Sequence, residues 1–83
     1  MTSVSRAMYC DWVINALVAL ETATPQEVYR WIKANETVPS SELTRTAQRG
    51  EILFEKNVRW ARFTLLKEGV ISDREGWGVW TLV

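Results

Sequence analysis

The sequence predicts a small α+β fold, a winged helix-turn-helix with three or four helices closed by a C-terminal β-hairpin wing. Two observations predict it. Apolar residues follow helical spacing through most of the chain, and two β-type segments joined by turn residues come after the last helix. With 83 residues and 47% apolar content, the chain is expected to form a single domain over residues 1–83, with residues 1–5 flexible.

The first helix is predicted over residues 6–20. Its inward stripe recurs at helical spacing and comprises Tyr9, Val13, Ala16, Leu17 and Leu20. Asp11 and Asn15 mark the side that faces water. Trp12 widens the apolar surface beyond one stripe, so the helix is expected either to be buried on most sides or to contact a second molecule.

A second helix is predicted over residues 25–35, after a short connector at residues 21–23. Thr24 is a suitable N-cap, Pro25 needs no N–H partner in the first turn, and Glu27 completes a capping box. The residues expected to face inward are Val28, Trp31 and Ile32.

The next segment is less regular. A short helical turn is expected after Pro39, capped by Ser40 or Ser41 and ended by Gly50. Its apolar positions are Leu43 and Ala47. A short strand is expected at residues 51–53.

The best-defined element is a helix over residues 54–68, ended by Gly69 in the left-handed conformation. Its buried face is predicted to consist of Phe54, Val58, Ala61 and Leu65. Two strands and the turn between them are expected at residues 70–71, 77–82 and 72–76. Trp80 is expected in the core.

The composition argues against several classes of function. The chain has no His and a single Cys, Cys10, so it lacks the commonest general base and cannot build a cysteine-based zinc site. We therefore expect no enzymatic activity, no metal and no cofactor. The longest apolar stretch, residues 13–20, is interrupted by Asn15 and is too short to span a bilayer, so we expect no membrane partner. A single cysteine allows no disulfide within the chain, so we expect a cytoplasmic location.

The charge distribution points to a nucleic acid. The net charge is zero, yet residues 45–67 carry six basic and only two acidic residues. Projected at about 100° per residue, the helix at 54–68 presents basic and aromatic residues opposite its buried face. These residues are Lys56, Trp60, Phe63 and Lys67, with Arg59 beside them and Asn57 on the other flank. Glu55 precedes Arg59 by one turn and is expected to pair with it.

Such a face suits DNA, because cations meet phosphates while Arg, Lys or Asn side chains reach base edges. We predict double-stranded DNA as the partner, with the helix at 54–68 as recognition helix. The predicted contacts are Lys56, Asn57, Arg59, Arg62, Lys67, Arg49 and, in the wing turn, Arg74.

The alternative is a protein-interaction or dimerisation module. Zero net charge and surplus aromatic residues favour it, since aromatic side chains dominate protein-binding hot spots. Its anchors would be Trp12, Trp60, Phe63 and Trp77, and the partner either a second copy of the chain or another protein. Packing of Trp60 and Phe63 under residues 35–53 is a further interpretation.

Four blocks of sequence resemble a known family: ATPQEVY at 23–29, FEKNVRWAR at 54–62, LLKEGVI at 65–71 and GVWTL at 78–82. Together they resemble the N-terminal winged-helix domain of Mrr-like restriction proteins. The resemblance implies DNA binding, places Asn57, Arg59 and Arg62 in or near the recognition helix, and implies a separate nuclease domain that these residues do not contain. The chain departs from the family pattern at Lys56-Asn57, where Asn followed by a basic residue is expected, and at Trp77, where a basic residue is common.

Overall fold

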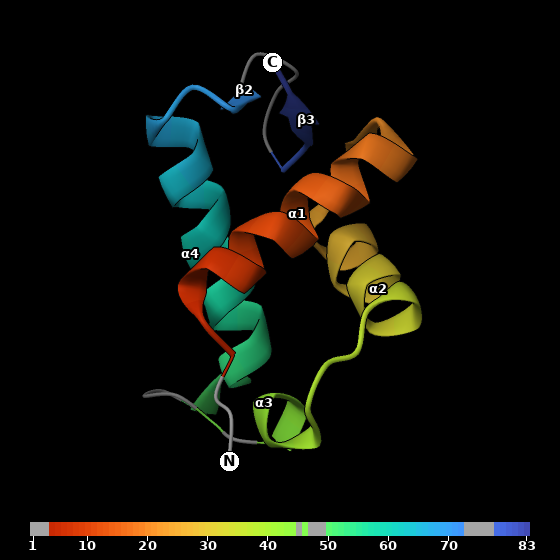
Figure 1. Cartoon of the computed structure of the whole chain (residues 1–83), viewed down its shortest axis with the longest axis vertical. Helices are drawn as coiled ribbons and strands as arrows, with labels where there is room; N and C mark the ends of the chain where they lie inside the picture. Colours follow the sequence, from red (N-terminus) through yellow and green to blue (C-terminus); the bar gives the residue numbers. More distant parts are fainter. Residues whose placement is uncertain (1–3, 45, 47–49, 73–77) are drawn as a thin grey trace.

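Helix α1 (Arg6–Leu20) lies at the centre of the computed structural model, crossing α4 (Leu53–Lys67) and reaching over α2 (Pro25–Asn35) (Figure 1). The structure describes residues 4–44, 46, 50–72 and 78–83. The remaining elements are β1 (Thr22–Ala23), α3 (Ser40–Thr44), β2 (Ile71–Ser72) and β3 (Trp80–Leu82). The described residues thus form four helices and a three-stranded antiparallel sheet, which confirms the predicted α+β class and is compatible with a winged helix.

The core forms where α1 meets α4, α2 and β3. Four of the five residues predicted for the inward stripe of α1 are buried, and the fifth, Leu20, is half-buried. Trp12 is also buried, with 5% of its surface exposed, and its ring packs edge-on against Tyr9 at 5.0 Å between centroids. The expectation that Trp12 anchors a partner is therefore wrong, because α1 is buried on more sides than one stripe.

Helix α2 begins as predicted. Thr24 Oγ1 accepts a hydrogen bond from the Glu27 amide at 3.3 Å, and Glu27 Oε1 accepts one from the Thr24 amide at 2.9 Å. This capping box lowers the pKa of Glu27, chiefly through the bond from the Thr24 backbone. The helix buries Val28 and Ile32 as expected, whereas Trp31 is only half-buried.

The sheet has the order β1–β3–β2, with both neighbours antiparallel to the central strand. Strand β1 was predicted as a connector, because two residues are too few to show a periodicity. It pairs Ala23 with Trp80, and Thr81 donates a side-chain hydrogen bond to the carbonyl of Glu21 at 3.2 Å. Trp80 is buried as predicted, and Gly69 ends α4 with a φ of 80°.

The segment before α4 differs from the prediction. The expected strand at 51–53 reduces to one bridge between Thr46 and Ile52, and α4 starts one residue early, at Leu53. Gly50 has a φ of 74° but lies well beyond the end of α3, so it does not stop that helix. Ala47, predicted in the same turn, lies outside the described residues.

One buried polar contact ties α3 to the core. The Tyr9 hydroxyl donates a hydrogen bond of 2.5 Å to Glu42 Oε1, and Glu42 is only 6% exposed. The Tyr9 ring also lies 6.1 Å from that of Phe54, at the first turn of α4. Through its hydroxyl and its ring, Tyr9 therefore joins α1, α3 and α4 at one point. None of the described helices has the length and apolar character needed to cross a membrane.

Candidate nucleic-acid interface

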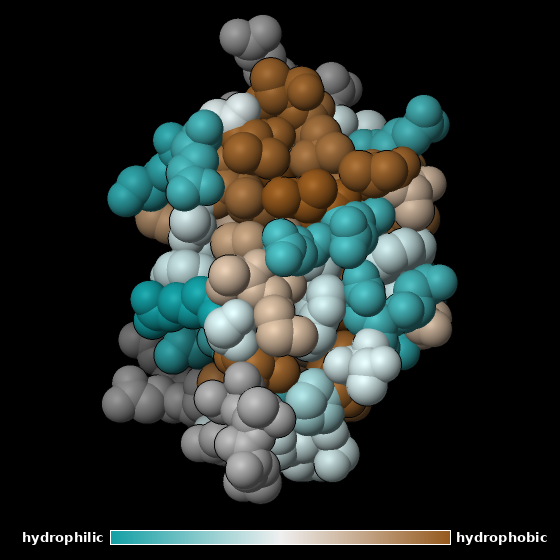
Figure 2. Space-filling model, in the orientation of Figure 1, coloured by the Kyte–Doolittle hydropathy of each residue, from teal (hydrophilic) through white to brown (hydrophobic). Residues whose placement is uncertain are grey.

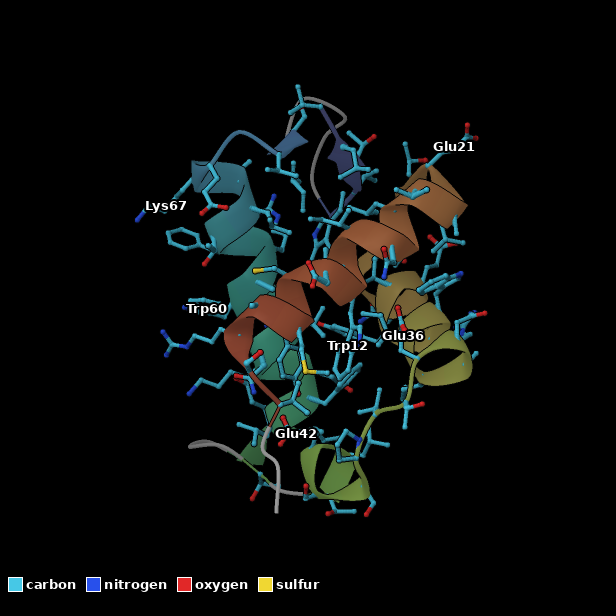
Figure 3. The ribbon with its side chains drawn as sticks, viewed as in Figure 1. Trp12, Glu21, Glu36, Glu42, Trp60 and Lys67 are labelled. Carbon is cyan, nitrogen blue, oxygen red and sulfur yellow. The ribbon has the colours of Figure 1, made fainter. Side chains whose placement is uncertain are left out.

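Helix α4 has two opposite faces. The predicted inner face is confirmed, since Phe54, Val58, Ala61 and Leu65 are each at most 3% exposed. The opposite face carries a row of residues that we call the α4 stripe, consisting of Lys56, Trp60, Phe63 and Lys67. Figure 3 shows Trp60 and Lys67 projecting from the same side of the helix, the side away from α2. Burial of the inner face therefore fixes which side chains α4 presents to solvent.

Cations and aromatic rings are paired along the stripe. The Arg6 guanidinium lies 4.4 Å from the centroid of the Trp60 ring, and Lys67 Nζ lies 5.6 Å from that of Phe63. Trp60 is half-buried against the core, whereas Phe63 is 57% exposed. The exposure of Phe63 contradicts the interpretation that this ring packs under residues 35–53, whereas Trp60 is partly covered. The stripe is an exposed surface on which each ring already attracts a cation.

Arg6 is a member of this surface that sequence reasoning missed. It is the first residue of α1, and it reaches the stripe because the N-terminal end of α1 lies beside α4. No sequence pattern links positions so far apart. With Arg6, three cations surround the two rings, and α4 has no acidic residue between Glu55 and Glu68. The stripe is therefore a locally positive surface on a chain without net charge.

Arg59 lies on the flank of α4 that faces α2. It forms a hydrogen-bonded ion pair with Glu51, and not with Glu55 as predicted. That hydrogen bond is the main cause of the raised pKa of Arg59, and Tyr29 lies near enough to contribute. The charge of Arg59 is partly neutralised within the chain, so it is less available to a phosphate than the charge of Lys56.

Arg62 faces the sheet rather than the stripe. It is half-buried, and its guanidinium carbon lies 5.8 Å from the centroid of the Trp80 ring. Its Nε atom is buried and has no hydrogen-bond partner among the described residues. Arg62 is thus less exposed than Lys56 and Lys67, and its contact with DNA stays a prediction.

Asn57 is turned toward α1. Burial and the hydrogen bond to Glu42 raise the pKa of Tyr9, and a hydrogen bond with Asn57 opposes that change. Asn57 thus takes part in the buried contact between helices rather than in the exposed surface. Of the predicted DNA contacts, the structure brings Lys56 and Lys67 together on the stripe. Arg49, Arg74 and Trp77 lie outside the described residues.

A second surface is apolar. Figure 2 shows it over the C-terminal half of α1 and the neighbouring end of the sheet. The exposed or half-buried apolar residues of these elements include Ile14, Val18, Val70, Leu82 and Val83. The Val83 amide donates a hydrogen bond to the Val70 carbonyl at 2.9 Å, which closes the sheet end of the surface. Contiguous exposed apolar surface of this kind is typical of contacts with another macromolecule.

No protein-family profile, curated protein or solved structure matches this chain. The resemblance to Mrr-like restriction proteins therefore stays a prediction from the sequence. The α4 stripe and the apolar surface are the two candidate binding surfaces among the described residues.

Proposed function

We propose that the chain is a winged-helix module, similar to the N-terminal domain of Mrr-like restriction proteins, that binds double-stranded DNA in the cytoplasm with α4 as its recognition helix. The observation that carries the proposal is the α4 stripe, a solvent-facing row of two lysines and two aromatic residues without an acidic neighbour in the row. The order of helices and strands agrees with it, since a hairpin of β2 and β3 follows directly after α4.

The chemistry of DNA suits this surface. Lys56 and Lys67 are eleven positions apart, which is about 16 Å along the helix axis. They can therefore neutralise phosphates on the two sides of a groove while Phe63 and Trp60 lie between them. Arg6 adds a third cation beside Trp60. Each phosphate that a cation neutralises releases counterions, so the affinity has to fall as salt rises.

The test is a fluorescence anisotropy titration of a labelled random-sequence 20-base-pair duplex at about 50 and 200 mM salt. Wild type is compared with the double variant Lys56→Gln/Lys67→Gln. The matched control is Arg30→Gln/Lys33→Gln, which removes the same charge from exposed positions of α2. We expect the stripe variant to weaken binding and to lower the slope of log affinity against log salt by about 1.8, and the control to change neither.

Two results would contradict the proposal. One is the absence of binding at about 10⁻⁴ M protein, which is weaker than typical non-specific DNA affinity. The other is an equal loss of affinity in the α2 control, since binding would then depend on total charge and not on α4.

The apolar surface favours a second candidate function, dimerisation with a second copy of the chain. A two-fold interface requires a surface that is complementary to itself. Glu21 and Lys67 lie on opposite sides of the apolar surface (Figures 2 and 3), so a copy rotated by 180° can bring opposite charges together. Val18 is 66% exposed in α1 and is the residue to change.

Dimerisation is tested by analytical ultracentrifugation over a wide range of protein concentration. We expect Val18→Asp to shift the protein toward the monomer mass, because a carboxylate would be buried in the interface. Ala34→Asp, at an exposed position of α2, is the control and should leave the mass distribution unchanged. A wild-type protein that stays monomeric at millimolar concentration would rule out this second function.

A further inference from the structure

Phe63 is exposed in the middle of a positive surface. It is 57% exposed. Along the α4 stripe it lies between Lys56 and Lys67, the two lysines at the ends of the row. Phosphate binding needs cations and gains nothing from a phenyl ring. The ring points to a ligand that offers an apolar π-surface next to an anionic group.

A nucleotide has both parts in one molecule. A base can stack on the phenyl ring, while the phosphate attached to its sugar meets a lysine. Lys67 Nζ lies 5.6 Å from the centroid of the Phe63 ring, so a base on that ring would have an ammonium group within reach of its phosphate. The Trp60 ring is less open, since it is half-buried against the core, whereas the Phe63 ring is 57% exposed. Phe63 is therefore the ring of the stripe best placed to receive a base.

Bases inside a paired duplex cannot supply this contact, because both faces of each base are covered by its neighbours in the stack. In the interior of a duplex, only a base that has left the stack presents a free face. We infer that Phe63 binds an extrahelical nucleobase, so that the protein prefers DNA containing an unpaired base to fully paired DNA. The inference rests on the proposed DNA-binding function and specifies the form of DNA that is bound.

The experiment compares two labelled duplexes by fluorescence anisotropy at fixed salt. One is a fully paired duplex of about 20 base pairs, and the other has the same sequence with one bulged thymine at its centre. Wild type should bind the bulged duplex about tenfold more tightly, as expected for one base stacked on an aromatic side chain. Phe63→Leu keeps an apolar side chain without a π-face, and it should lose this preference, so that its affinities for the two duplexes become equal.

A matched variant makes the test specific. Phe63→Trp keeps an aromatic face at the same exposed position and should retain the preference for the bulged duplex. Equal affinity of wild type for the two duplexes, or a preference that survives in Phe63→Leu, would overturn the inference while leaving DNA binding intact. No binding to either duplex at about 10⁻⁴ M would overturn the proposed function together with the inference.

Discussion

Phe54 and Phe63 belong to the same helix and have opposite surroundings. Phe54 is 1% exposed and packs between the rings of Tyr9 and Tyr29, with 6.1 Å between centroids on each side. Phe63 is 57% exposed and has a lysine over its ring. Phenylalanine thus has a different role on each face of α4. The inner face holds the fold together, and the outer face is available to a ligand.

The largest expected effect is the difference in free energy of unfolding between a variant of the inner face and a variant of the outer face. Phe54→Ala removes a ring from the centre of the core and should lower the free energy of unfolding by about 3–5 kcal/mol, which is most of the stability of a small domain. Phe63→Ala should change it by no more than about 0.5 kcal/mol. Urea unfolding followed by circular dichroism measures both. Similar losses in the two variants would show that the outer face is also structural.

A smaller effect is expected where the inner face of α4 meets α1 and α3. Tyr9→Phe keeps the ring beside Phe54 but removes the hydroxyl that donates to Glu42. The buried carboxyl of Glu42 loses a partner, and the free energy of unfolding should fall by about 1–3 kcal/mol. The double variant Tyr9→Phe/Glu42→Leu, compared with the two single variants, gives a double-mutant cycle for this hydrogen bond. Additive losses would mean that the two groups are not coupled in solution.

Alkaline pH should weaken the same region. Burial, reinforced by the hydrogen bond to Glu42, raises the pKa of Tyr9 above its ordinary value, and burial raises that of Tyr29. The unfolded chain releases these protons near pH 10 while the folded chain retains them, so stability is complete below about pH 10 and falls as pH rises above it. Each such tyrosine contributes a slope of up to about 1.4 kcal/mol per pH unit. Urea unfolding between pH 9 and 11 should show a shallower decline for Tyr9→Phe than for wild type.

The smallest expected effect distinguishes the flank of α4 from its outer face. Arg59→Gln breaks the ion pair with Glu51. Both side chains of this pair are partly exposed, so the free energy of unfolding should fall by no more than about 1 kcal/mol. Lys56→Gln should leave the free energy of unfolding unchanged, because no ion pair of Lys56 is present among the described residues. For DNA affinity the order should be reversed, with Lys56→Gln the more damaging. An Arg59 variant that weakened DNA binding more than the Lys56 variant would assign Arg59 to the interface.

Local patterns predicted the scaffold of the fold. The spacing of Phe54, Val58, Ala61 and Leu65 identified the inner face of α4, and Thr24 with Glu27 identified the start of α2. Both signals arise within a few residues and need no knowledge of the tertiary structure. Strand β1 was missed because it exists only through pairing with β3, nearly sixty residues later.

The candidate site was predicted less completely, because the roles of charged residues depend on contacts between distant elements. Arg59 and Arg62 look equivalent to Lys56 in the sequence, yet one pairs with Glu51 and the other covers Trp80. Arg6 looks unrelated to α4 and lies over Trp60. Periodicity showed which side of α4 is exposed, but could not show which cations on that helix are already engaged.

The position of β3 has a consequence for how the protein is made. This strand is the middle of the sheet, so β1 and β2 have no common partner until residues 80–82 have left the ribosome. The helices can collapse on one another during synthesis, but Trp80 reaches the core only at that late stage. Until β3 is in place, the side of α1 that contacts it lacks that part of its cover.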